Sequence, residues 1–120
     1  MANPLHTIVE TPDFLADAKR AGMTDAEREA AVQLYASQPD VGEEIVGSGG
    51  VRKGRLAGRG KGKSGGYRIV AVFVGATVPV YLIGVLSKGD RETFTDAEVK
   101  EFKKVTTALK AAFRAQRRAD

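Results

Sequence analysis

Cationic side chains and glycines that could bind phosphate gather in the middle of the sequence, between Gly47 and Arg68. This segment holds most of the chain's 14 glycines, and from residue 51 onward it contains no acidic residue. Its cations are Arg52, Lys53, Arg55, Arg59, Lys61, Lys63 and Arg68. Because so many like charges repel one another, they favour an anionic partner, and glycine lets backbone N–H groups approach such an anion closely. The segment therefore predicts phosphate binding, as in a nucleic acid.

The rest of the composition removes several other kinds of site. The chain has no cysteine, which excludes disulfides, thiolate metal ligands and a cysteine nucleophile. Its one histidine, His6, lies far in sequence from the basic segment, which argues against a histidine-based metal site or triad. Asp96 and Glu98 fit helix capping, and Glu43–Glu44 fits a solvated connector, so no carboxylate pair is a candidate for acid–base work. We therefore expect no metal and no cofactor.

The positive charge is local. The chain has a formal net charge of +4, but residues 1–50 carry −6, residues 51–68 carry +7 and residues 69–120 carry +3. A field this concentrated is typical of a binding face. The longest apolar run, residues 69–80, is too short and too interrupted to cross a membrane, so we expect a soluble, cytoplasmic protein with no membrane partner.

Two nucleotide-binding motifs occur in the glycine-rich loop, and both lack the required context. Residues 60–65 match GxGxxG, and Gly62-Lys63-Ser64 matches the end of a Walker A motif. In both families a helix must follow, so that its N-terminus meets the phosphates. Here the loop leads into Tyr67–Val74, which has the pattern of a strand. We reject both motifs.

The elements that would position the cations are strands. Val51–Ala57 is predicted to be a strand that presents Lys53 and Arg55 on one face. Arg68 then enters the apolar strand Tyr67–Val74, where an unpaired cation is costly unless it points into a functional surface. A third strand, Val78–Ser87, completes an antiparallel meander and leads to Lys88, close to the start of the preceding strand. Tyr67 could stack on a base, or it could be a core residue.

Helices are predicted on either side of these strands. After a short opening strand in Leu5–Val9, one helix runs from Pro12 to Ala21, with Phe14, Leu15 and Ala18 inward. A capping box at Thr24–Glu27 begins a second helix that ends near Ser37, with Ala30, Ala31, Leu34 and Tyr35 on one face. A second capping box at Thr95–Glu98 begins a long terminal helix whose inward residues are Val99, Phe102, Val105, Leu109 and Phe113. The expected fold is α+β in one domain, residues 1–120: a small antiparallel sheet with an N-terminal helical hairpin and a C-terminal helix.

Several of these segments resemble one known family. The sequence resembles the RelE/HigB toxins of bacterial toxin–antitoxin systems, and the similarity covers roughly residues 8–109. The segments that carry the resemblance are Val51-Arg52-Lys53-Gly54-Arg55, Gly60–Arg68 with the apolar strand after it, and Ser87–Arg91 with the helix after it. Gly54 stands where relatives usually have a larger apolar residue, and Phe94 lies near a position where some members have a catalytic tyrosine.

The resemblance implies a RelE-like fold and a toxin that cleaves mRNA on the translating ribosome and so inhibits translation. By motif position, the catalytic cations would be Lys53, Arg55 and Arg68. The candidates for substrate binding are Arg52, Lys61, Lys63, Lys88, Arg91 and Tyr67. The RNA's own 2′-hydroxyl would attack the phosphorus, with Arg68 at the phosphorane and Lys53 assisting deprotonation. The implied partner is an antitoxin, commonly a helix-turn-helix protein from an adjacent gene.

Two other functions remain open. A ParE-like relative would keep the fold and inhibit DNA gyrase without cleaving nucleic acid, although such an inhibitor does not need cations in a cleft. A plain RNA- or ribosome-binding module would bind without cutting the message.

Overall fold

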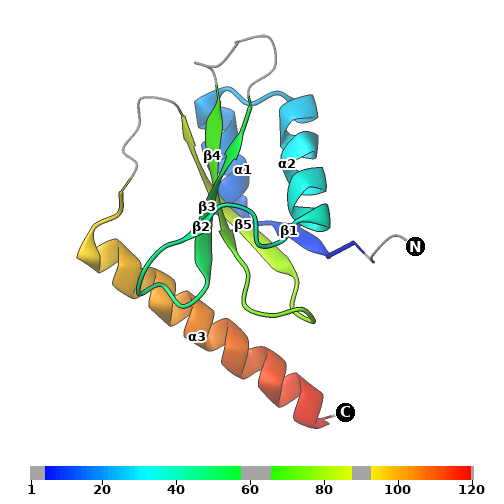
Figure 1. Cartoon of the computed structure of the whole chain (residues 1–120), viewed down its shortest axis with the longest axis vertical. Helices are drawn as coiled ribbons and strands as arrows, with labels where there is room; N and C mark the ends of the chain where they lie inside the picture. The colour runs from blue at the N-terminus through cyan, green and yellow to red at the C-terminus, as the bar shows by residue number, and fades with distance from the viewer. Residues whose placement is uncertain (1–4, 58–65, 88–92, 120) are drawn as a thin grey trace.

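The computed structural model describes residues 5–57, 66–87 and 93–119. Within these residues, five strands form a single sheet in the order β1-β5-β4-β3-β2 (Figure 1). The elements along the chain are β1 (Ile8–Glu10), α1 (Pro12–Ala21), α2 (Asp25–Ser37), β2 (Glu43–Glu44), β3 (Val51–Leu56), β4 (Tyr67–Val72), β5 (Val80–Ser87) and α3 (Asp96–Ala119). The α+β fold predicted from the sequence is confirmed.

The predicted meander of three strands is present, and two edge strands extend it. β3, β4 and β5 pair antiparallel in sequence order. β1 joins the sheet as the parallel neighbour of β5, with Ile8 opposite Val80 and Glu10 opposite Leu82, so the whole sheet is mixed. The two strands can be parallel because a long connection, which includes both helices, separates β1 from β5 in the sequence. At the other edge β2 pairs antiparallel with β3, inside a segment expected to be a simple connector.

α1 and α2 begin at the caps that the sequence predicts. The Thr11 side chain accepts a hydrogen bond from the backbone N–H of Phe14, and Gly22, with φ 78°, ends α1 in the left-handed conformation. Thr24 and Glu27 form the predicted capping box at the start of α2. These bonds satisfy N–H groups that the first turn of a helix leaves without partners.

One face of the sheet packs against α1 and α2. The buried residues of this core are Phe14, Ala18, Ala31, Tyr35, Tyr67, Ile69, Ala71, Val80, Leu82 and Val85. Leu15 was predicted to point inward, but it is 39% exposed, and Ala30 is also exposed. The reason is geometric: residues four apart, such as Phe14 and Ala18, share the buried stripe, and their neighbours lie on its border or beyond it.

The opposite face packs against α3 at one end only. Val51, Val70 and Val72 are buried there, and Phe102 and Leu109 of α3 pack against them as predicted. Val105, also predicted to point inward, is 43% exposed, because its neighbour Thr106 takes the buried position. The Thr106 hydroxyl donates to Ser48 O at 2.8 Å, in the loop between β2 and β3. Figure 1 shows α3 crossing this end of the sheet, away from α1 and α2. Among the described residues, no helix is both long enough and apolar enough to cross a membrane.

Candidate active site on strands β3 and β4

Three of the predicted site cations share one face of the sheet. The register of β3 and β4 pairs Arg55 with Arg68 and Lys53 with Val70. Residues directly opposite in an antiparallel pair point to the same face, and so do residues two apart in one strand. Lys53, Arg55 and Arg68 therefore lie together, on the face that α3 covers further along. We call these three residues the cationic face.

The cationic face is more exposed than the other end of the same side of the sheet, which α3 covers. Along β3, burial falls from Val51, which is fully buried, through the half-buried Lys53 to the exposed Arg55. Burial also falls along the neighbouring strand β4 toward the same end of the sheet, from the buried Val72 to the half-buried Arg68. The apolar end supports α3, and the cationic end is left accessible to a ligand from solvent.

Arg55 and Arg68 are placed in a pairing that favours an anion. Side chains directly opposite in such a pair have Cβ atoms about 4.5–5.5 Å apart, and like charges at that separation destabilise the sheet. A phosphate between two guanidinium groups would turn this repulsion into two charge-assisted hydrogen bonds. The register thus sets two guanidinium-bearing residues opposite each other, with Lys53 diagonally beside them.

Gly54 lies between two of these cations and faces the other side of the sheet. A Cβ atom at this position would lie 2.5 Å from the Tyr35 hydroxyl oxygen and 3.4 Å from Val41 Cγ1. The space that a larger side chain would need is filled by the Tyr35 ring of α2. Burial raises the pKa of Tyr35 to about 12, and the positive charge of Arg52 lowers it in part. Gly54 therefore lets β3 pass closely beneath α2.

A comparison with protein families agrees with this geometry. A family model described as the RelE toxin of the RelE/RelB toxin–antitoxin system matches residues 7–118. The match includes every strand and helix of the structure except the last residue of α3. The chain belongs to the RelE toxin family. It is therefore a toxin of a toxin–antitoxin system, and a cognate antitoxin is its partner.

Arg52 of this RelE-family toxin does not join the cationic face. Strand alternation places it on the opposite side of β3, towards α2. Its Nη2 atom donates to Gly42 O at 2.7 Å, and its buried Nε atom has no hydrogen-bond partner among the described residues. The contact with Gly42 ties the connector after α2 to β3, which is a structural role for a residue predicted to bind substrate.

Tyr67 is also on the face opposite the cations in this toxin. Its side chain is 4% exposed, and its hydroxyl donates to Glu27 Oε1 at 3.2 Å. Burial raises the pKa of Tyr67, and the negative charge and hydrogen bond of Glu27 raise it further. The sequence left two interpretations of Tyr67 open, a stacking residue or a core residue, and in the structure Tyr67 is a core residue.

The other predicted contacts of the toxin, Lys61, Lys63, Lys88 and Arg91, lie outside the described residues. The described ends of their segments are informative. Tyr67 pairs with both Leu56 and Ser87, so the chain leaves β3, enters β4 and leaves β5 at one end of the sheet. That end is the one that carries Arg55 and Arg68.

Sequence reasoning missed two acidic residues near this toxin's site. Glu43 of β2 pairs with Lys53, so its side chain lies at the edge of the cationic face, and its presence in a two-residue edge strand has no clear sequence signal. Glu27 was explained by its capping box. Nothing in the sequence indicates that the same carboxylate also accepts a hydrogen bond from Tyr67, 40 residues later.

Proposed function

We propose that this protein is an endoribonuclease that cleaves mRNA on the ribosome. The observation that carries the proposal is the register of β3 and β4, which sets Arg55 opposite Arg68 with Lys53 beside them on an open face. Membership of the RelE toxin family supports the same function. Cations are well suited to this reaction because charge builds up on the phosphate as the bond is cleaved.

The proposed mechanism uses a nucleophile from the RNA itself. The 2′-hydroxyl of one nucleotide loses its proton to solvent and forms a bond with the adjacent phosphorus. The bond from phosphorus to the 5′-oxygen of the next nucleotide then breaks, and that oxygen takes up a proton from solvent. The products are a 2′,3′-cyclic phosphate and a free 5′-hydroxyl.

Each residue of the cationic face has a role in this mechanism. Arg68 stabilises the negative charge of the phosphorane, and Arg55 holds the same phosphate from the opposite strand. Lys53 stabilises the developing 2′-oxyanion and so assists deprotonation of the 2′-hydroxyl. Alignment of the attacking oxygen with the leaving oxygen would come from the ribosome-bound message together with these contacts.

Arg68→Ala is expected to lower the cleavage rate by on the order of 10²–10³, the usual effect of removing one donor to a developing charge. The measurement is primer extension on a defined message in a translation reaction, with wild-type and variant protein. Arg20→Ala is the matched control, since Arg20 lies on α1 with a 75% exposed side chain and forms an ion pair with Asp17. This control should cut at the wild-type rate.

Other results would redirect the assignment. A message that stays intact with wild-type protein, while translation proceeds, would exclude the ribonuclease and leave gyrase inhibition to be tested by DNA supercoiling. Stable binding to ribosomes with an intact message would identify a binding module. Equal cleavage by the wild type and Arg68→Ala would place the active site elsewhere.

A further inference from the structure

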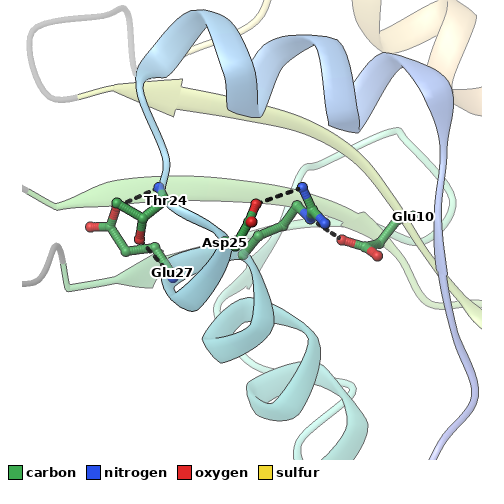
Figure 2. A network of polar contacts seen from close by, with 5 residues as sticks. Glu10, Thr24, Asp25 and Glu27 are labelled. Atoms are coloured by element: carbon green, nitrogen blue, oxygen red, sulfur yellow. Dashed lines mark hydrogen bonds and ion pairs between the residues drawn. The ribbon is translucent and has the colours of Figure 1, made fainter.

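A buried carboxylate connects α2 to the strand that carries Arg68. Glu27 is 3% exposed and lies in the first turn of α2. Its Oε1 atom accepts hydrogen bonds from the Thr24 backbone N–H at 2.9 Å and from the Tyr67 hydroxyl at 3.2 Å. Figure 2 shows Thr24 and Glu27 facing each other across the capping box. A buried carboxylate is stable only when it is well hydrogen-bonded, so these contacts hold Glu27 in one position.

Tyr67 links the fixed Glu27 to the strand that carries Arg68. It is the first residue of β4, and Arg68 follows it directly, with its side chain on the opposite side of the sheet. Strand ends fray unless they are anchored, and this end of the pair carries Arg55 directly opposite Arg68. The hydroxyl of Tyr67, bonded to the fixed Glu27, is an anchor at the residue next to Arg68.

We propose that Glu27 and Tyr67 are positioning residues for Arg68. The capping box fixes Glu27, Glu27 fixes the Tyr67 hydroxyl, and Tyr67 fixes the backbone from which Arg68 reaches the phosphate. The inference rests on the proposed ribonuclease function, and it assigns to α2 a part in catalysis without any contact with RNA.

Tyr67→Phe tests this role with the smallest change, since the ring remains and only the hydroxyl is lost. We expect the maximal cleavage rate at saturating ribosomes to fall about tenfold, because Arg68 is no longer held in its productive position. The ribosome concentration that gives half the maximal rate should stay unchanged, since Arg55 and Lys53 still bind. Glu27→Gln keeps an oxygen that can accept a hydrogen bond from the Tyr67 hydroxyl, so this variant should retain more cleavage activity than Glu27→Ala.

Thr106→Val is the matched control. It also removes a buried hydroxyl and its hydrogen bond to a backbone oxygen, but at the end of the sheet covered by α3. Its thermal midpoint should fall about as much as that of Tyr67→Phe, while cleavage at a temperature where both are folded should match the wild type. A general loss of stability would instead lower cleavage equally in the two variants, which would overturn the inference.

A second comparison separates positioning from an independent effect. In an Arg68→Ala background, Tyr67→Phe should change the residual cleavage rate less than about twofold, since there is no guanidinium left to position. A further tenfold loss in that background would contradict the proposal, and so would full activity of the single variant. If the wild type itself does not cleave, the proposed function fails and the inference falls with it, whereas a cleaving wild type with an equally active Tyr67→Phe refutes the inference alone.

Discussion

At the scale of single residues, Gly54 shows how closely the two faces of the sheet constrain each other. Its neighbours Lys53 and Arg55 point to the cationic face, while its own missing side chain makes room for Tyr35 on the face packed against α2. The Tyr35 hydroxyl also lies 3.5 Å from Ile69 O, a weak contact with the next strand. The ring thus rests on the part of β3 and β4 that carries the three cations.

Gly54→Ala is expected to destabilise the protein by about 1–3 kcal/mol, because the added methyl group collides with the buried hydroxyl oxygen of Tyr35. In a Tyr35→Phe background that oxygen is absent, and the next ring atom, Cζ, lies 3.5 Å from the added Cβ. The cost should then be clearly smaller. The free energy of unfolding in urea for the wild type, both single variants and the double variant measures this coupling. The same cost in both backgrounds would show that the clash with Tyr35 is not the cause.

The sequence supports prediction of some residues better than others. Strand alternation predicts that Lys53 and Arg55 share one face of β3. Arg68 is a candidate by its position in the family motif, and the register of β3 and β4 places it on the same face. Arg52 and Tyr67 belong to the same motifs, but alternation alone does not say which face is open. That depends on where α2 and α3 pack, which only the folded chain shows.

At the scale of elements, an arginine bridge fastens the opening strand to the helical hairpin. Arg28 of α2 forms ion pairs with Glu10 of β1 at 3.0 Å and with Asp25 at 3.5 Å, and dashed lines mark these contacts at the labelled Glu10 and Asp25 in Figure 2. The Arg28 side chain is 40% exposed and that of Glu10 31% exposed. The pair is therefore partly shielded from water, which makes it stronger than a fully solvated pair but still sensitive to salt.

Arg28→Ala should lower the free energy of unfolding by about 0.5–1 kcal/mol at low ionic strength, and by less in high salt. Arg20→Ala is the reference, since its pair with Asp17 links positions within α1 only and is more exposed. It should change the free energy of unfolding by no more than about 0.5 kcal/mol. Denaturant titrations at two salt concentrations make the comparison. A salt-independent effect of Arg28→Ala would point to lost packing of its aliphatic stem instead.

The caps and the long strands are the elements that local sequence determines, since the capping boxes at Thr24 and Thr95 and the Gly22 cap need only neighbouring residues. β2 was not predicted. Glu43 and Glu44 have no strand pattern, and they pair only because the turn that follows brings them beside β3. The parallel pairing of β1 likewise depends on contacts with residues about 70 positions later, which no local pattern contains.

At the scale of the whole molecule, the sheet separates charge. The segment 1–50 has a net charge of −6 and forms β1, α1, α2 and β2. Its acidic helix, α2, lies on the face away from the cations, while Glu43 of β2 lies at their edge. A molecule arranged in this way has a field that turns its cationic face toward a polyanion during approach. The same polyanion repels α2, which carries three acidic residues and one arginine, so the orientation that turns α2 toward it is disfavoured.

Arg55→Ala should weaken binding to a short single-stranded RNA and make the binding less dependent on salt. Each phosphate contact in single strands contributes about 0.7 to the slope of log K against log salt concentration, so the slope should fall by about that amount. Fluorescence anisotropy at several salt concentrations gives this slope for the wild type, Arg55→Ala and Arg20→Ala. Arg20→Ala should keep the wild-type slope, and an unchanged slope for Arg55→Ala would mean that Arg55 makes no phosphate contact.

The parallel strand at the edge also sets the order in which the chain can fold during its own synthesis. β1 leaves the ribosome first, but its partner residues Val80 to Leu82 are made only after the hairpin that carries the cations. An isolated hairpin of two strands is at best marginally stable in water. The cationic face therefore gains a firm support only when β5 has emerged, and a nascent chain stopped before that strand lacks the sheet on which Arg55 and Arg68 are held.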